Sequence, residues 1–376
     1  MAGIYIHIPF CKQACHYCDF HFTTSLKYKE ELLSALQKEL IISKGYLQEQ
    51  TIESIYLGGG TPSLLSAQEI NYLLDTIYTH FSIASNPEIT IEANPDDLTK
   101  EKVRELRESL INRFSIGVQS FYEEDLRWMN RAHNAQEADS AIKRVQDAGF
   151  EDITADLIYG YPLLSDLKWI NNIQQIINLG IPHLSAYSMT IEPQTALASF
   201  INKGIQKPMN EGQSADQFLI LTEMITKVGF EQYEISNYAK NERYSKHNTN
   251  YWKGVPYLGI GPSAHSFNGT SRQWNIANNS KYIQSIIKNE IPMEMEVLTE
   301  SDKFNEYVMT SLRTKWGIDI NYLNQNFPSE FMQAMNECLP KYQEEKKIKQ
   351  EKNIYTLTQK GKLLADQIAS EFFTTH

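Results

Sequence analysis

Three cysteines lie close together near the N-terminus with the spacing C-x₃-C-x₂-C: Cys11, Cys15 and Cys18. Three thiolates can ligate three irons of a 4Fe-4S cluster and leave the fourth iron open to a small molecule. The chain holds one further cysteine, Cys338, so a disulfide framework is the weaker interpretation. The nearby His16 and His21 leave a zinc site open as an alternative. The spacing itself favours a cluster with one open iron.

Short apolar strands that alternate with helical segments are expected to position these cysteines. The expected strands are Ile4–Ile8, Ser54–Leu57, Glu88–Glu92, Arg113–Val118, Ile153–Ile158 and His183–Ser188. The expected helices, in which apolar residues recur three and four positions apart, are 27–43, 66–80, 99–110, 134–148 and 165–179. Ser66 and Glu69 form a capping-box pattern at the start of one helix. These repeats predict an α/β fold with a parallel sheet, either open or curled into a partial barrel.

Chemically distinctive residues lie at or just beyond the end of every expected strand. They include a Gly58-Gly59-Gly60-Thr61-Pro62 turn and the polar side chains of Glu92, Gln119, Asp156, Tyr187, Thr190 and Glu192. Because ligands bind beyond the carboxyl ends of parallel strands, we expect these groups to line one pocket. Carboxylates such as Glu92 and Asp156 suit ribose hydroxyls, and they also suit helix caps or ion pairs. The glycines also suit an ordinary tight turn.

Composition narrows the classes of function. The 376-residue chain has 41% hydrophobic and 22% charged residues, as ordinary globular proteins do. Its formal net charge of −11 argues against binding to a nucleic-acid backbone. No apolar run is long enough to cross a bilayer, and the first residues lack the pattern of a signal peptide. Reduced cysteines and an oxygen-sensitive cluster predict a cytoplasmic location.

The motifs together resemble the radical S-adenosylmethionine superfamily, and within it the oxygen-independent coproporphyrinogen III oxidase group. The resemblance rests on His7-Ile-Pro-Phe-Cys11, Gly58-Gly-Gly-Thr-Pro-Ser63, Glu92-Ala-Asn-Pro95, Gly117-Val-Gln-Ser-Phe121 and Asp156-Leu-Ile-Tyr-Gly160. It implies a partial (β/α)₆ TIM-like barrel in which Cys11, Cys15 and Cys18 hold a 4Fe-4S cluster. It also implies contacts to S-adenosylmethionine from Tyr5, Gly59, Gly60, Thr61, Glu92, Gln119, Arg131 and Asp156.

Two types of protein share these motifs, and two features of this chain separate them. The dehydrogenase type continues its cysteine motif to a fourth cysteine, whereas Phe20 occupies that position here. The residues His247, Asn248, Tyr251 and Trp252 match the HNxxYW motif of the heme-chaperone type, HemW, which is linked there to heme binding. An imidazole can ligate iron, and aromatic rings offer flat faces to a porphyrin. Alternatively, His247 and Trp252 only anchor a long loop over the barrel.

The resemblance therefore implies a HemW-like heme chaperone. It would bind the cluster, S-adenosylmethionine and heme, and transfer heme to an acceptor hemoprotein, which could be membrane-bound. The alternative is an enzyme that decarboxylates coproporphyrinogen III oxidatively by means of a 5′-deoxyadenosyl radical. Whether the chain is an enzyme is left open by the sequence.

A second domain is expected after Pro292, where the alternation of strands and helices stops. Residues 1–292 are the expected core, with a cover region at about 200–292, and residues 293–376 are the expected C-terminal domain. Its expected helices are Glu300–Thr314, Phe331–Cys338 and Gly361–Phe373, with a hairpin at Ile348–Thr358. This order resembles a winged-helix-like HemN C-terminal domain. The acidity of the chain and the family resemblance favour a role in protein contact or as a lid over DNA binding.

Overall fold

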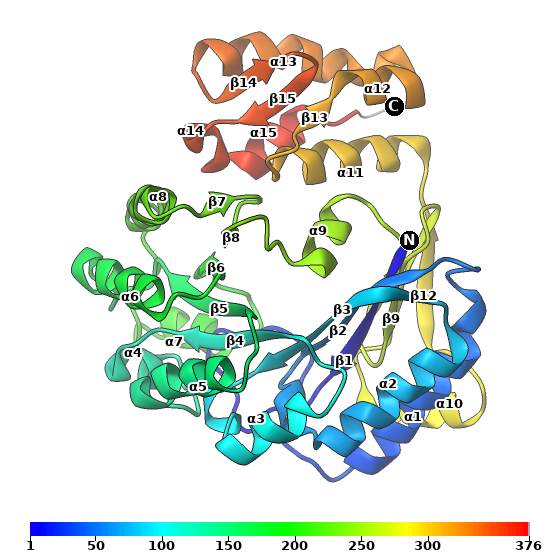
Figure 1. The fold of residues 1–376 in the computed structure, drawn as a ribbon. Coiled ribbons are helices and arrows are strands. Elements are labelled where there is room, and N and C mark those ends of the chain that lie inside the picture. The colour runs from blue at the N-terminus through cyan, green and yellow to red at the C-terminus, as the bar shows by residue number, and fades with distance from the viewer. Residues whose placement is uncertain (375–376) are drawn as a thin grey trace.

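The structure is a computed structural model that describes residues 1–374. Its centre is a curved sheet in which six successive strands pair in parallel (Figure 1). They are β1 Ala2–Ile8, β2 Ile52–Gly59, β3 Ile83–Ala93, β4 Arg113–Gln119, β5 Asp152–Tyr159 and β6 His183–Ser188. All six expected strands are confirmed, and so is the partial-barrel fold. β3 begins five residues before the expected Glu88.

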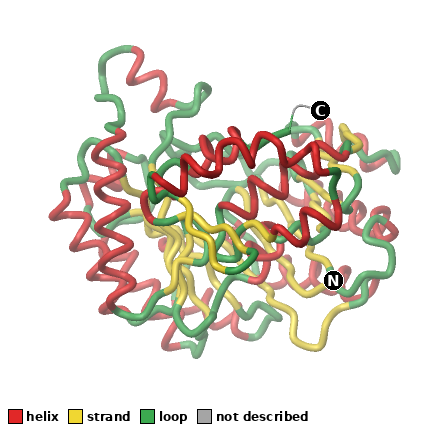
Figure 2. The backbone as a smooth tube through the Cα atoms, turned by 90° about the horizontal axis from the view of Figure 1, so that it is seen from above, coloured by secondary structure: helices red, strands yellow, loops and turns green. Residues whose placement is uncertain are grey.

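Helices connect these strands and cover the outside of the sheet. They are α1 Lys29–Ile42, α2 Ala67–His80, α3 Lys100–Arg107, α4 Glu123–Trp128, α5 Ala135–Asp147 and α6 Asp166–Leu179. In Figure 2 the long helices at the left edge run outside the strands. The expected capping box is present at α2, where Ser66 and Glu69 bond each other's backbone N–H groups. Of these six helices, α4 was not expected, because its six residues are too few to show helical periodicity.

Both edges of the sheet are extended by shorter strands. Beyond β1 lie β9 Tyr257–Ile260, which is parallel to it, and then antiparallel β10 His265–Phe267, β11 Ser271–Asn275 and β12 Met293–Val297. Beyond β6 lie β8 Asn237–Ala239 and β7 Glu231–Gln232. Short strands from the region expected as a cover, about 200–292, are therefore part of the sheet. The sheet also continues through β12, five residues past the expected boundary at 292.

The helix α9 Lys246–Trp252 enters the open side of the barrel at the amino ends of the strands (Figure 1). Its N-cap is Ser245, whose side chain accepts the N–H of Asn248. The carboxylate of Glu88 on β3 accepts the N–H groups of Lys246 and His247 at 2.8 and 3.0 Å. A carboxylate is favourable at a helix N-terminus because the free N–H groups there carry partial positive charge. Glu88 thereby fixes the start of α9 inside the barrel.

Three further helices belong to the core: α7 Ala196–Asn202, α8 Glu211–Lys227 and α10 Asn279–Ile287. The remaining elements surround a second apolar cluster, which includes Phe304, Val308, Met335 and Ile368. They are α11 Glu300–Leu312, β13 Ile318–Asp319, α12 Ile320–Asn326, α13 Gln333–Glu344, β14 Ile348–Glu351, β15 Ile354–Leu357, α14 Gln359–Lys362 and α15 Ala365–Glu371. The expected hairpin is β14–β15, and β13 joins it as a third strand. Within residues 1–374, no helix has the length and apolar character that crossing a membrane requires.

The C-terminal elements lie above α9 in Figure 1, and cation–π contacts join the two. The guanidinium carbon of Arg313 lies 5.4 Å from the ring centroid of Trp252. The ammonium group of Lys253 lies 4.3 Å from the ring centroid of Trp316. Such contacts contribute roughly 0.5–2 kcal/mol each, depending on their burial. They connect α9 to the C-terminal elements as well as to the barrel.

Candidate cofactor site

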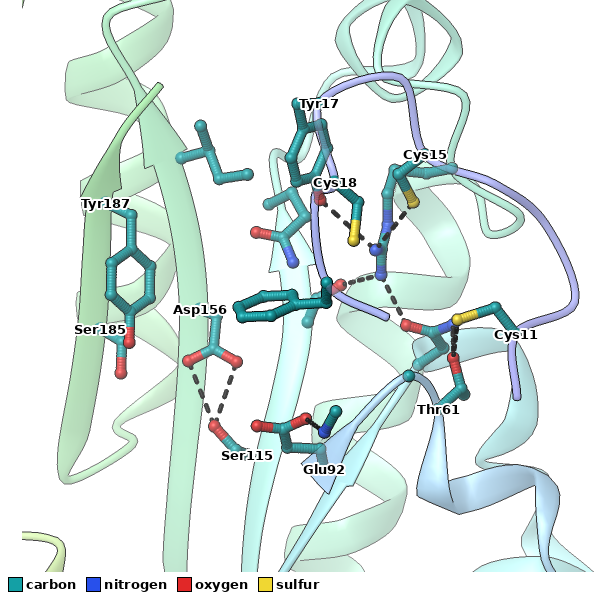
Figure 3. Close-up of a pocket in the computed structure, with 18 of the residues that line it drawn as sticks. Cys11, Cys15, Tyr17, Cys18, Thr61, Glu92, Ser115, Asp156, Ser185 and Tyr187 are labelled. Atoms are coloured by element: carbon teal, nitrogen blue, oxygen red, sulfur yellow. Dashed lines mark hydrogen bonds between the residues drawn. The ribbon is translucent and has the colours of Figure 1, made fainter. Parts of the chain in front are cut away.

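A cavity of about 520 Å³ extends from the carboxyl ends of the strands into the barrel (Figure 3). Its size is typical of sites for small ligands. It brings together most of the residues that the sequence analysis singled out: Cys11, Cys15, Cys18, Gly59, Gly60, Thr61, Glu92, Gln119, Arg131, Asp156, Tyr187, Thr190, Glu192 and Asn248. Four of the expected contacts do not line it: Tyr5, His247, Tyr251 and Trp252.

The three cysteines lie on the loop after β1, and two of their sulfur atoms have polar neighbours. The hydroxyl of Thr61 donates to the sulfur of Cys11 at 3.5 Å, and Nη1 of Arg131 donates to the sulfur of Cys15 at 3.4 Å. Burial raises the pKa of the Cys11 thiol, and it raises the pKa of the Cys18 thiol to about 12. Without a metal these two groups are therefore neutral thiols at neutral pH.

Both histidines that kept zinc open as an alternative are engaged elsewhere. Nδ1 of His16 lies 2.9 Å from the carbonyl oxygen of Trp128, and Nε2 of His21 lies 2.7 Å from Oδ1 of Asn279. Neither imidazole lines the cavity. Across residues 1–374, no three His, Cys, Asp or Glu side chains converge on the site of a single metal ion. The arrangement therefore does not support the zinc interpretation.

The glycine-rich turn after β2 brings backbone close to the cysteine loop. Gly59 has φ +104°, and a Cβ atom there would lie 2.4 Å from Nδ1 of His7. A Cβ atom on Gly60 would lie 2.7 Å from the carbonyl oxygens of Ile8 and Phe10. Neither position has room for a side chain, because a Cβ atom would overlap neighbouring atoms. At Gly59 the positive φ disfavours a side chain as well. The glycines are more than a permissive turn, because they allow backbone to form one wall of the cavity.

Replacing Gly59 by alanine is expected to destabilise the protein by about 2 kcal/mol or more. Alanine at positive φ is strained, and its methyl group would overlap the buried imidazole of His7. The free energy of unfolding from a denaturant titration measures this effect. Gly45→Ala is the matched control, because a Cβ atom there meets no atom within 4 Å and φ is not positive. Equal stability of the two variants would contradict the expectation.

Two carboxylates, Glu92 on β3 and Asp156 on β5, point into the same space in Figure 3. The hydroxyl of Tyr56 and the N–H of Gly59 donate to Glu92 at 2.9 and 3.0 Å. The hydroxyl of Ser115 lies 3.0 and 3.2 Å from the two oxygens of Asp156. Burial raises the pKa of Glu92 to about 7 and that of Asp156 to about 6. The pair can accept hydrogen bonds from a ligand with neighbouring hydroxyls.

Arg131 and Gln119 lie nearer the rim of the cavity, beside the cysteines. Nη2 of Arg131 donates to Oδ1 of Asn94 at 2.6 Å and to the carbonyl oxygen of Gly117 at 3.0 Å. Its buried Nε has no hydrogen-bond partner within residues 1–374. Gln119 ends β4 at φ +64°, which is unusual for a residue with a side chain. Strained backbone of this kind is frequent at ligand sites.

His247 lies beneath the cavity, within the barrel. Its ring stacks on Tyr56 at a centroid distance of 5.1 Å, and its Nδ1 lies 3.0 Å from the hydroxyl oxygen of Ser54. Burial, together with the charge of Arg113, lowers the pKa of His247 to about 4. The imidazole is therefore neutral at neutral pH. Tyr5, which also misses the cavity, stacks on Tyr56 and contacts Nδ1 of His7 at 3.2 Å.

The sequence analysis missed several residues that line the cavity: Tyr17, Tyr56, Arg113, Ser115, Thr154 and Ser185. Arg113, Ser115 and Gly117 are alternate residues of β4, and all three line the cavity. Side chains at alternate positions of a strand point to the same face. The sequence could have predicted these cavity residues, because polar residues recur at alternate positions of an otherwise apolar strand.

Comparisons with known proteins agree with this geometry. The family model of the Radical SAM superfamily matches residues 5–176, and that of the HemN C-terminal domain matches residues 298–364. The heme chaperone HemW of Bacillus subtilis is 32% identical over 375 residues, covering 99% of both chains. This chain belongs to the HemW family. HemW of Escherichia coli is 38% identical over 272 residues, covering 70% of this chain and 69% of the relative.

A solved structure, described as coproporphyrinogen III oxidase (HemN) from Escherichia coli, a radical SAM enzyme, resembles the HemW-family chain throughout. The match has a TM-score of 0.86 and covers 100% of this chain and 90% of the other. The sequence identity is 22%, so the similarity concerns the fold. It extends through the C-terminal elements as well as the barrel.

The residues of the cavity fit the groups that the radical SAM superfamily implies, a 4Fe-4S cluster and S-adenosylmethionine. Such a cluster binds each thiolate at a separate iron, so the three cysteines need not converge on one point. All three cysteines line the same cavity, and metal binding would convert their buried thiols into thiolates. The unpartnered Nε of Arg131 lies at the same end. This donor set suits a cluster together with an anionic ligand group.

Proposed function

We propose that the protein is a heme chaperone, which binds heme together with a 4Fe-4S cluster and S-adenosylmethionine and transfers heme to an acceptor hemoprotein. The observation that carries the proposal is the position of the motif His247-Asn248, inside the barrel and directly beneath the cysteine-lined cavity. The names of the relatives from Bacillus subtilis and Escherichia coli support it. We place this activity in the cytoplasm, in keeping with the four free cysteines.

In this proposal Cys11, Cys15 and Cys18 hold the cluster. Arg131 and the backbone of Gly59, Gly60 and Thr61 would bind the amino-acid end of S-adenosylmethionine, with Gln119 nearby. Glu92 and Asp156 would accept hydrogen bonds from its ribose. Tyr5 contributes only through packing against Tyr56, since it does not line the cavity. When bound, the cluster supplies an open iron and an electron at the rim of the barrel.

The proposed heme contact is the α9 motif. Nδ1 of His247 is held by Ser54, and Nε2 makes no hydrogen bond within the described residues, so Nε2 is the nitrogen we assign to iron. A neutral imidazole is the form that ligates metals. Access of heme to His247 requires α9 to move relative to Ser54 and Tyr56. Tyr251, which is 51% exposed, and Trp252 offer aromatic faces on the outer part of α9.

Contact with the acceptor hemoprotein is assigned to the C-terminal domain, residues 293–376 in the expected division. Arg313 and Lys315 already contact aromatic residues of the segment that contains α9. A partner that moves these side chains would also move α9. No role in binding nucleic acid is proposed, in keeping with the net charge of −11.

An anaerobic heme titration of the cluster-reconstituted protein tests the proposal, with absorption in the Soret region as the signal. We expect saturation near one heme per chain. His247→Ala is expected to weaken binding by about tenfold or more, since it removes the iron ligand. His80→Ala, on α2, is the matched control and is expected to bind as the wild type does. Failure of the wild type to bind heme would contradict the proposal.

The second candidate is an oxygen-independent coproporphyrinogen III dehydrogenase. It is favoured by the match in fold to HemN over the whole chain. Anaerobic turnover of coproporphyrinogen III by the reconstituted protein, with no saturable heme binding, would favour this candidate over the chaperone. Heme binding without turnover would favour the chaperone.

A further inference from the structure

We propose that Arg113 forms an anion-binding subsite at the inner end of the cavity, and that this subsite takes a carboxylate group of a ligand other than S-adenosylmethionine. Arg113 is the first residue of β4, and its side chain is only 5% exposed. It lines the same cavity as the cysteines, from the opposite end. The proposal does not depend on heme binding.

The guanidinium of Arg113 has few partners for a buried cation. Its one hydrogen bond within residues 1–374 goes from Nη2 to the hydroxyl oxygen of Thr154. It forms an ion pair with Glu88, in which Nε lies 3.6 Å from the carboxylate oxygen, too long for a hydrogen bond. The oxygens of Glu88 instead accept the N–H groups of Lys246 and His247. A guanidinium has five N–H donors, and a buried charge is costly unless its donors are paired. Arg113 therefore has donors available to a ligand.

The charges of the cavity alternate along its length. Arg131 lies at the rim, where it bonds the carbonyl oxygen of Gly117. Gly117 and Arg113 are four residues apart on β4, which corresponds to about 13 Å along the strand. Glu92 and Asp156 lie between these two positions, since Ser115 bonds Asp156 and pairs with Glu92 in the sheet. The order from rim to interior is thus positive, negative and positive.

S-adenosylmethionine, the proposed cofactor, would account for the positive charge at the rim and for the two carboxylates behind it. Its amino-acid end would meet Arg131 and the cysteines, and its ribose would meet Glu92 and Asp156. Arg113 has no counterpart in that arrangement, because it lies beyond the two carboxylates. A second ligand that enters the inner part of the cavity would meet it directly.

The same cavity also offers a neutral donor. Asn248 of α9 also lines the cavity, and its side-chain amide makes no hydrogen bond within residues 1–374. An arginine fork and an amide N–H together suit a planar carboxylate, which can accept two parallel hydrogen bonds from guanidinium. We assign the subsite to carboxylate-bearing molecules, and inorganic phosphate is the competing anion that the test has to distinguish.

Titration of the cluster-reconstituted, full-length protein with ¹³C-labelled propionate tests the subsite, with the carboxyl chemical shift as the signal. We expect saturable binding in the range of roughly 1–20 mM for one charged contact. Arg113→Gln is expected to weaken binding by about tenfold or more, because the ligand loses its charged donor. Arg127→Gln, at a side chain that is 76% exposed, is the matched control and is expected to bind as the wild type does.

Three results would overturn the inference: no saturable binding of propionate by the wild type, equal affinity in Arg113→Gln, or tighter binding of inorganic phosphate at the same residue. If Arg113→Gln does not fold, Arg113→Lys provides the test, because it keeps the charge and loses the fork. An affinity several-fold below that of the wild type would support the subsite, and an unchanged affinity would overturn it. Propionate is the only ligand in this test, so a failure of heme binding leaves its outcome unchanged.

Discussion

Replacing Cys15 by serine is expected to abolish assembly of the iron–sulfur cluster. Bound iron should fall from about four to less than about one per chain, because an open-iron cluster has only three protein ligands and loses one of them. Cys15 lies between the other two cysteines on the loop and contacts Arg131, so no nearby thiol can replace it. Iron and sulfide analysis after anaerobic reconstitution, together with visible absorption, measures the effect. Cys11→Ser and Cys18→Ser are expected to behave in the same way.

Cys338→Ser is the matched control for this series. Cys338 lies on α13 and packs against the apolar cluster of the C-terminal elements. Its removal is expected to leave iron binding unchanged. Loss of the cluster in Cys338→Ser, or its full retention in Cys15→Ser, would contradict the assignment of ligands.

Replacing Glu92 by glutamine is expected to weaken binding of S-adenosylmethionine by about 10- to 100-fold at pH 8. This range corresponds to the loss of hydrogen bonds to a charged acceptor, worth about 1.5–3 kcal/mol. Glu92 faces the cavity and is held by Tyr56 and Gly59, so its carboxylate is already oriented toward a ligand. Anaerobic calorimetry of the reconstituted protein measures the dissociation constant. Glu123→Gln, on the exposed part of α4, is the matched control.

The same carboxylate predicts a pH dependence of cofactor binding. Burial raises the pKa of Glu92 to about 7, so protonation begins near neutral pH in the cofactor-free protein. The charged form is the better acceptor of hydrogen bonds from ribose hydroxyls. As the pH falls from 8 to 6, the wild type is expected to lose affinity by up to about tenfold per unit below pH 7. The glutamine variant should keep only the smaller loss that comes from Asp156, whose pKa is about 6. A parallel loss of equal size in both proteins would contradict the assignment.

The raised pKa of Glu92 affects the stability of the fold in the opposite direction to cofactor binding: stability rises as the pH falls. A carboxyl group whose pKa is higher in the folded state binds more protons when folded, so it stabilises the fold at low pH. That contribution is fully present below the unfolded value near 4.5 and is lost as the pH rises through about 7. The cofactor-free protein therefore keeps a costly carboxylate at neutral pH. Hydrogen bonds from a ligand would offset that cost.

Local sequence alone determined the cysteine loop after β1, the glycine turn after β2 and the six parallel strands. Each depends on residues that are close together in the chain. The cysteine loop depends on the spacing of three cysteines, and the turn depends on glycines that permit positive φ. The strands depend on short apolar runs that lie between segments with helical periodicity. The sequence also predicted that Glu92 and Asp156 lie in one cavity, because the carboxyl ends of parallel strands share one edge of the sheet. These parts of the structure agree with the expectations.

Only the tertiary structure decided what lies inside the barrel. Glu88 and His247 are 159 positions apart, and the hydrogen bond between them places α9 under the cavity. The available donors of Arg113 depend on that same contact, since Glu88 accepts hydrogen bonds from α9 and only forms a longer ion pair with the guanidinium. Tyr5 likewise packs on Tyr56 rather than facing the cavity. Such long-range pairings depend on how the sheet curves and which segment fills its open side, and no local pattern in the sequence records either.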